Sequence, residues 1–276
     1  MIALIRTEFT KAASRTRTAI IALLLIGLPT LIVVAINARR DRPHRDDGEG
    51  LFRLASQSGL LVPAAVLSAT SGFLLIVIAG MFAGDSVASD ASWGNLRYVL
   101  MRPVSRARLL LAKSFVAGAL IWAATILVTV AALVAGVVLF GVHDVKVPGF
   151  GGLVSGFDLS SGALALRVLI ATAYVAFGLS ALLAIGTLFS TMTDTAASAI
   201  GATVGIYIVS EILDSITQLG QVRYGFPTHY FDAWETMFTD NTYSREMVVG
   251  IVVQAAYVLV VGTAAVLYFN RKDIRS

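Results

Sequence analysis

The sequence predicts an all-α integral membrane protein, and two observations carry that prediction. Of the 276 residues, 57% are apolar and only 14% are charged, whereas an ordinary soluble domain has about 25% charged residues. The apolar residues also gather in six stretches long enough for a helix to cross a bilayer core of about 30 Å. This composition excludes a soluble enzyme, a disordered chain and a free nucleic-acid-binding domain. The absence of cysteine excludes disulfides, thiolate metal sites and a cysteine nucleophile.

The six spans account for most of the chain, so we expect one transmembrane domain over residues 1–276. The second, third and fourth spans exceed the minimum of about 20 residues, which predicts tilt or kinks. A basic segment precedes the first span, as in a signal peptide, but the apolar run is longer than usual and lacks a small-residue cleavage site, which favours a retained anchor. The predicted spans are Ala19–Ile36, Leu60–Phe82, Phe115–Phe140, Ala163–Phe189, Ala196–Ile216 and Met247–Phe269.

The positions of lysine and arginine predict that both termini are cytoplasmic. Six spans put the two termini on one side of the membrane. The segments on that side hold twelve of the 21 Lys and Arg residues, and the outer side holds nine. The positive-inside rule therefore favours this orientation by a small margin.

Residues 1–18 form a predicted amphipathic interface helix. Ile2, Ile5 and Phe9 follow helical spacing and share a face. Such a helix lies in the interface plane beside a span, with its cations at the lipid headgroups. It is either an elbow that moves with a partner or a simple anchoring flank. Its cations are Arg6, Lys11, Arg15 and Arg17.

The connection over residues 84–113 is the most informative cytoplasmic segment, because the other connection on that side is short. A short helical run over residues 95–101 ends before Pro103, since proline lacks an N–H donor and disfavours helix just before it. A second run begins at Arg106 and leads into span three. A projecting helix with basic and aromatic residues suits docking against another protein. The alternative is an interfacial hairpin that only orients spans two and three.

This connection resembles the first cytoplasmic loop of ABC-2-type exporter permeases, the membrane subunits of ABC transporters. The family pattern is a small-residue turn, an acid, Gly-Thr-Leu-Arg, then Leu-x-x-Pro-Val-Ser-Arg and a lysine that opens the next span. Asp90 replaces the usual glutamate and Asn95 the usual threonine, and both keep the charge or the hydrogen-bonding capacity. The matching residues are Gly84, Asp90, Gly94–Arg97, Leu100–Arg106 and Lys113.

The resemblance implies a coupling helix in this loop, seated in a groove of an ATP-binding subunit. It implies two such subunits, which hold the ATP and magnesium, and a second permease subunit, identical or homologous, in the bacterial cytoplasmic (inner) membrane. Asp90 is expected to cap the helix or to pair with a cation of the partner, and Arg106 is either a contact or an anchor at the membrane surface. The expected coupling residues are Asp90, Gly94, Leu96, Arg97, Leu100, Pro103 and Arg106.

The sequence lacks the common motifs of catalysis and nucleotide binding. It contains no G-x-x-x-x-G-K-[ST] segment to cradle ATP phosphates, so we expect hydrolysis on a separate polypeptide. G-x-S-x-G and H-E-x-x-H motifs are also absent. His229 and Asp232 have a spacing that metal ligands can have, but one pair is too little for a site. We therefore expect no catalytic residue, bound cofactor, metal or nucleic-acid partner.

Three charged residues lie toward the outer ends of the fourth and fifth spans: Arg167, Glu211 and Asp214. Charges at such depths are costly unless they are paired or hydrated. They form either a polar gate at the outer mouth or an Arg167–Glu211 ion pair, with snorkelling to the interface as a further alternative. In the fifth span, Gly201-x-x-x-Gly205 permits close helix approach, either within the subunit or at a dimer seam.

The outer segment over residues 217–244 is rich in aromatic residues. In the resembling family this connection forms short re-entrant helices that close the exit path, and re-entrant backbone must be buried in protein or line a cavity. An aromatic belt at the membrane interface is the alternative. The aromatic residues singled out are Tyr224, Phe226, Tyr230 and Trp234.

Together these features predict a permease subunit of an ATP-driven exporter. Two subunits would enclose a pathway for an amphipathic or hydrophobic substrate and work by alternating access. An ion-coupled secondary transporter is the first alternative, and the scarcity of ionisable residues near the bilayer centre speaks against it. A non-transporting membrane scaffold is the second, and the coupling-loop motif speaks against that.

Overall fold

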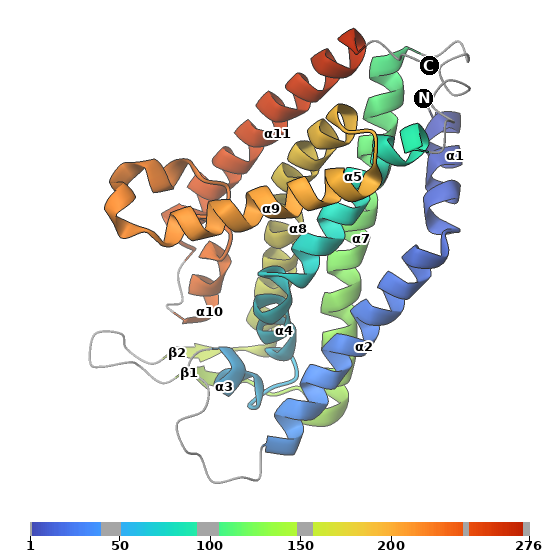
Figure 1. The fold of residues 1–276 in the computed structure, drawn as a ribbon. Coiled ribbons are helices and arrows are strands. Elements are labelled where there is room, and N and C mark those ends of the chain that lie inside the picture. The colour runs from blue at the N-terminus through green and yellow to red at the C-terminus, as the bar shows by residue number, and fades with distance from the viewer. Residues whose placement is uncertain (1, 40–50, 93–104, 148–156, 240–242, 273–276) are drawn as a thin grey trace.

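The computed structural model describes residues 2–39, 51–92, 105–147, 157–239 and 243–272. The described chain is a helical bundle (Figure 1), with element bounds as follows: α1 Ile2–Ala13, α2 Thr16–Arg39, α3 Leu51–Ala55, α4 Val62–Ser71, α5 Leu74–Ser92, α7 Arg106–Phe140, β1 Val145–Val147, β2 Phe157–Leu159, α8 Ser161–Met192, α9 Ala196–Ser215, η1 Thr217–Gly225, η2 Ala233–Glu235, α10 Thr236–Thr239 and α11 Arg245–Arg271.

Five of these helices, α2, α7, α8, α9 and α11, are long and apolar enough to cross a membrane. Helices α4 and α5 meet the same criterion as a pair, but their axes bend by 58° at a short break. The chain is therefore an all-α multi-pass membrane protein with five spans, or six if the bent pair counts as one. The predicted second span, Leu60–Phe82, is not one continuous helix. Gly72 stands at the break, where glycine weakens a helix by about 1 kcal/mol relative to alanine.

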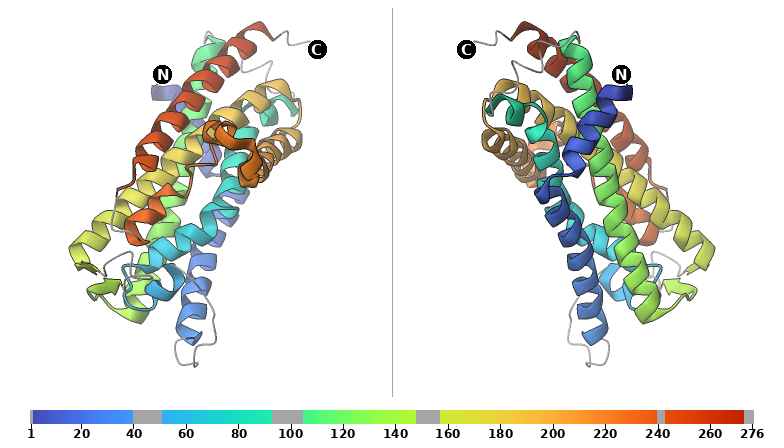
Figure 2. Two further views of the ribbon diagram at one scale, coloured as in Figure 1. Left: turned by 90° about the vertical axis from the view of Figure 1, so that its left-hand side faces the viewer. Right: turned by 90° about the vertical axis from the view of Figure 1, so that its right-hand side faces the viewer.

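Helix α8 lies at the centre of the bundle and packs against α5, α7, α9 and α11. Glycine permits the closest approach between helices. A Cβ atom on Gly186 of α8 would lie 2.5 Å from the Cβ of Ala83 on α5, and one on Gly59 would lie 2.5 Å from the backbone of Gly136 on α7. Figure 2 shows α2 at the edge of the bundle against α7, where much of its apolar surface stays exposed. Such surface suits contact with lipid.

Side-chain caps fix where three of the spans begin. Ser160, Thr195 and Ser244 each accept a hydrogen bond from the backbone N–H three residues on, which satisfies a donor that the first turn of a helix leaves unpaired. The carboxylate of Asp144 also accepts bonds from the hydroxyl and backbone N–H of Ser161, both at 2.7 Å. These two bonds hold the pKa of Asp144 below its usual value.

Two short strands were not predicted from the sequence. Strands β1 and β2 pair antiparallel, with Val145 opposite Leu159, and both of these side chains are buried. The strands flank the glycine-rich residues 148–156, which lie outside the described ranges. Strands of three residues leave almost no alternating pattern to detect, so the sequence did not predict them.

Candidate functional site: a buried charge network and an outer cavity

Most of the predicted coupling residues lie outside the described ranges. This is true of Gly94, Leu96, Arg97, Leu100 and Pro103. The structure does describe the two residues that flank them, Asp90 near the end of α5 and Arg106 at the start of α7.

Asp90 joins three helices at the end of the bundle where the described chain begins and ends (Figure 1). Its side chain is buried, and its two carboxylate oxygens accept bonds from Lys11 of α1 at 2.7 Å and from Lys113 of α7 at 2.5 Å. Lys113 also pairs with Glu8 of α1 at 3.0 Å. Asp90 was expected to cap the coupling helix or to pair with a partner's cation, but it finds two cations within its own chain.

A second buried carboxylate lies one turn away on the same helix. Asp85 of α5 accepts bonds from Arg15 and Arg17, at the junction between α1 and α2. A buried carboxylate is tolerated only where cations and hydrogen bonds offset the loss of water. The pairs in this network therefore hold α1 and the start of α2 against α5 and α7.

The network corrects one expectation about the interface helix. The cations of residues 1–18 were expected at the lipid headgroups, but Lys11, Arg15 and Arg17 contact buried acids of α5 instead. The signal was visible in the sequence as two aspartates, Asp85 and Asp90, within an apolar helix that has only small residues between them. The sequence could not identify the partners, because they come from helices distant in the chain.

Partway along the bundle, away from the end with the chain termini, the outer segment folds back onto the helices (Figure 1). Trp234, Met237 and Phe238 are completely buried. The hydroxyl of Tyr174 on α8 donates to the backbone carbonyl of Tyr230 at 2.6 Å. A Cβ atom on Gly250 of α11 would lie 2.2 Å from that hydroxyl, so the segment needs a glycine here to approach α11.

The four predicted aromatic residues do not share one environment. Tyr230 and Trp234 are buried, Phe226 is partly buried and Tyr224 is exposed. Phe231, which was not singled out, packs edge-on against Tyr207 of α9 with ring centroids 6.1 Å apart. A segment with most of its aromatic residues inside the protein differs from a belt that faces the membrane interface.

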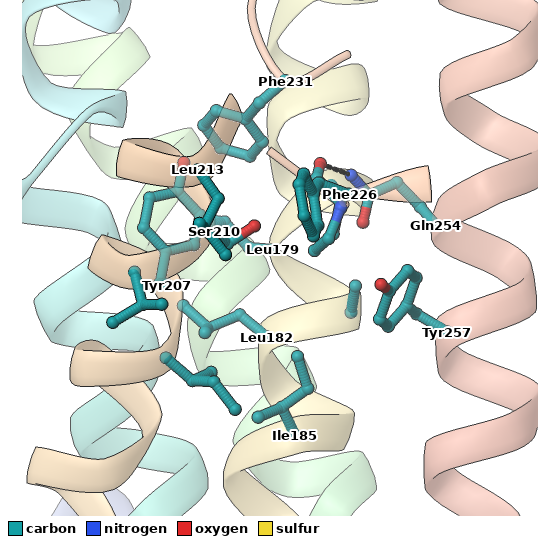
Figure 3. A pocket seen from close by; sticks show the side chains of 15 residues that line it. Leu179, Leu182, Ile185, Tyr207, Ser210, Leu213, Phe226, Phe231, Gln254 and Tyr257 are labelled. Atoms are coloured by element: carbon teal, nitrogen blue, oxygen red, sulfur yellow. Dashed lines mark hydrogen bonds between the residues drawn. The ribbon is translucent and has the colours of Figure 1, made fainter. Parts of the chain in front are cut away.

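A cavity of about 200 Å³ lies between the outer segment and the helices α8, α9 and α11 (Figure 3). Its walls are mainly apolar, with Leu182 and Tyr207 among them, and Phe231 lies at one end in Figure 3. Two side chains of α11 donate to backbone carbonyls of the outer segment. The amide of Gln254 donates to the carbonyl of Pro227 at 2.6 Å, and the hydroxyl of Tyr257 donates to the carbonyl of Gly225 at 3.1 Å. The outer segment is thus a wall of the cavity, tied to α11 by two hydrogen bonds.

The three charged residues predicted near the outer mouth have different surroundings. Arg167 is buried and donates to the backbone carbonyl of Met237. Asp214 pairs with His229 at 2.7 Å and with Arg223 at 3.6 Å. Arg167 lies on α8 and Glu211 on α9, which crosses the bundle obliquely while α8 runs along it (Figure 1). The Arg167–Glu211 ion pair stays a prediction.

The outer segment itself carries a carboxylate with a raised pKa. Partial burial raises the pKa of Asp232 from 3.8 to about 6, and the negative charges of Glu235 and Glu211 add to the effect. The folded chain therefore binds this proton more tightly than the unfolded chain does. His229 pairs with Asp214 and not with Asp232, the residue whose spacing suggested a metal ligand. The described residues contain no group of three or more His, Asp or Glu side chains arranged to hold a metal ion.

Two comparisons with known proteins bear on this architecture. A comparison with curated proteins found no match. Residues 51–275 match the model of a family described as "Protein of unknown function (DUF2705)". The match covers α3 to α11 and therefore includes Asp90, Lys113 and the whole outer segment. Since the match extends over well more than half of the sequence, the chain belongs to the DUF2705 family.

Proposed function

We propose that this chain is a membrane-spanning permease subunit of an ATP-driven exporter in the bacterial cytoplasmic membrane, with both termini cytoplasmic. A second permease subunit, identical or homologous, completes a pathway for an amphipathic or hydrophobic substrate. Two ATP-binding subunits carry the ATP and magnesium. ATP-driven closure of those subunits pushes on the coupling helix, the spans move as rigid bodies, and the outer end opens.

The observation that carries the proposal is the ABC-2-type motif on the connection between α5 and α7. Both helices that flank the connection are tied into the buried network, because Asp90 near the end of α5 pairs with Lys113 near the start of α7. Lys11 adds α1 to the same contact. A push on the connection would therefore move α1, α5 and α7 together, which suits the task of a coupling element.

The free face of α9 supports a second permease subunit. A Cβ atom on Gly201 or Gly205 would meet nothing within 4 Å. The Gly-x-x-x-Gly pair therefore does not serve packing within this subunit, and it leaves a shallow surface where another helix can approach closely. This favours the dimer seam over the alternative of internal packing.

The outer segment supports the assignment of an exit gate. Its buried aromatic residues and the apolar cavity beneath it form a cover. That cover is held by hydrogen bonds to α8 and α11 and by the contacts of Arg223 and His229 with Asp214 of α9. An apolar lining also suits an amphipathic or hydrophobic substrate better than an ion.

The docking assignment is tested with charged substitutions in the loop. The chain is purified with its neighbours, and the variants Leu96→Asp and Leu100→Asp are expected to lose the ATP-binding subunit while their helical content and thermal unfolding stay unchanged. Val222→Asp is the matched control, because Val222 is an exposed apolar residue on η1, away from the loop. An intact complex with unchanged coupled transport in both loop variants would refute the docking assignment.

Orientation is tested independently with single cysteines. The chain has no native cysteine, so Ser92→Cys and Asn241→Cys each introduce a unique thiol. A membrane-impermeant reagent added to intact cells should label Cys at position 241 and leave position 92 unlabelled until the cells are opened. Labelling of position 92 in intact cells would show that the orientation is the reverse of the one proposed.

A further inference from the structure

A second hollow, separate from the outer cavity, lies on the side of the bundle formed by α7, α8 and α11. It is a groove of about 700 Å³, within the range of pockets that bind whole small molecules. Leu111 and Phe115 of α7 line one wall and are exposed, and Gly262 of α11 lies on the other. Leu183 of α8 also lines the groove.

The length and position of the groove match one leaflet of a bilayer. Along α7 it extends from Leu110 to Trp122, which is about 18 Å at the 1.5 Å rise per residue of a helix. One leaflet of the hydrocarbon core is about 15 Å thick. The groove begins near the end of the bundle where α7 starts and α11 stops, so it spans the leaflet on the side of the chain termini.

The groove is apolar along its length and basic at that end. Arg108 is exposed and lies three residues before Leu111, on the same face of α7. Arg106 bridges the two walls, since it donates to the backbone carbonyl of Lys272 at 2.7 Å. Lys272 itself turns toward the α8–α9 connection, where it pairs with Asp194 at 3.1 Å. Arg106 and Arg108 of α7 therefore lie near this end of the groove, as does the exposed Arg271 in the last turn of α11.

We infer that this groove binds an anionic phospholipid from the leaflet on the side of the chain termini, with one acyl chain between α7 and α11 and the phosphate against Arg106 and Arg108. The apolar walls take the chain, and the basic end complements the headgroup charge, as basic pockets between transmembrane helices do. This inference does not depend on the proposed transport function, because it concerns a surface of the single chain.

Trp122 reports on the groove directly, because it lines the deep end and is 37% exposed. The purified full-length chain is titrated in neutral detergent with phosphatidylglycerol or phosphatidylcholine that carries bromine on the acyl chain, and quenching of tryptophan fluorescence is measured. Trp122→Phe identifies the part of the signal that comes from this residue. We expect quenching of Trp122 at a mole fraction of phosphatidylglycerol about fivefold lower than of phosphatidylcholine, since one basic residue near an anionic headgroup contributes about that factor.

Two variants and two matched controls separate the parts of the site. Gly262→Phe fills the groove without a clash, since nothing lies within 4 Å of its Cβ position, and it should abolish the quenching by both lipids. Arg108→Gln should keep the quenching and lose the preference for phosphatidylglycerol. Gly27→Phe on α2, where the Cβ position is equally open, and Arg245→Gln at the opposite end of α11 should change neither.

Three results would overturn the inference. The first is equal quenching of Trp122 by the two lipids in the wild-type chain. The second is unchanged quenching in Gly262→Phe. The third is a Trp122 shielded from both lipids, which would mean that a second protein chain occupies the groove.

Discussion

Two regions of this bundle are held together by different physical means. At the end with the chain termini, buried carboxylates on α5 pair with cations from α1, α2 and α7. Farther along the bundle, the outer segment packs mainly through aromatic rings and single hydrogen bonds onto α8 and α11, with partly exposed charged contacts to Asp214 of α9. A buried ion pair is costly to separate, because each partner would be left charged and without water. Apolar packing can open in a graded way, so the first region suits a rigid lever and the second a cover.

The largest effect is expected from breaking the network. Asp90→Ala leaves Lys11 without its carboxylate and Lys113 with only Glu8, and removal of one partner from a buried pair costs about 3–5 kcal/mol. Thermal unfolding of the purified chain should show this as a large loss of stability. Asp194→Ala is the control, since this acid is largely exposed and pairs with Lys272, and it should change nothing measurable. Equal effects of the two variants would mean that the network is no stronger than a surface pair.

An intermediate effect is expected from disturbing the close contact of α11 with α8 and the outer segment. Gly250→Ala forces a methyl group against the Tyr174 hydroxyl and against Tyr230, and such overpacking typically costs about 1–3 kcal/mol. The outer segment should detach first, which increases the labelling of a cysteine introduced at Thr228. Gly262→Ala on the same helix has open space around it and should be neutral or slightly stabilising. A stable Gly250→Ala variant with unchanged labelling would contradict the packing described here.

A smaller effect is expected from removing one hydrogen bond of the cover. Tyr174→Phe removes one of the two hydrogen bonds that the carbonyl of Tyr230 accepts, because the backbone N–H of Ala233 still donates to it. One such bond is worth about 0.5–1.5 kcal/mol. Amide hydrogen exchange over residues 228–238 should become faster, while exchange in the part of α5 around Asp90 stays slow. Equal acceleration of exchange in both segments would show that the bundle responds as one unit and that the two regions are not independent.

The smallest effect is a pH dependence confined to the outer segment. The pKa of Asp232 is raised to about 6 in the folded state, so the folded state binds this proton more tightly than the unfolded state does. The contribution is fully present below pH 3.8 and is lost as the pH rises through about 6, so packing of the segment should weaken slightly between pH 5 and pH 7.5. Asp232→Asn should abolish this slope in hydrogen exchange corrected for intrinsic rates. A slope that persists in the variant would assign it to another group.

The sequence predicted the helical membrane class and most of the spans because their signal is local. Twenty apolar residues in a row indicate a span whatever surrounds them. Helices α2, α8, α9 and α11 begin and end close to the predicted bounds, whereas α7 begins earlier, at Arg106, because the helical run predicted there continues into the span. The length of the second span predicted tilt or a kink, and α4 and α5 do bend by 58°, but the apolar run continues through the break and does not reveal its position. A hydropathy pattern records length and polarity but not helix direction.

The candidate sites were harder to predict because their partners are distant in the sequence. Lys11 and Lys113 meet on Asp90 only when three helices come together, and nothing in the local sequence distinguishes these lysines from surface anchors. Arg167 shows the same limit, since the carbonyl to which it donates belongs to Met237, 70 residues away in the chain. Tertiary arrangement decides which charges meet, and one sequence does not supply it.

The central claim, that the chain works as the permease of an ATP-driven exporter, is tested most directly by the composition of the native assembly. The chain is extracted from its own membrane under mild conditions, and the mass of the intact complex and the identity of its subunits are measured. The account predicts two permease subunits together with two ATP-binding subunits, which separate from the membrane part when Leu96 is replaced by aspartate. A homogeneous, folded chain that carries no ATP-binding subunit would contradict it.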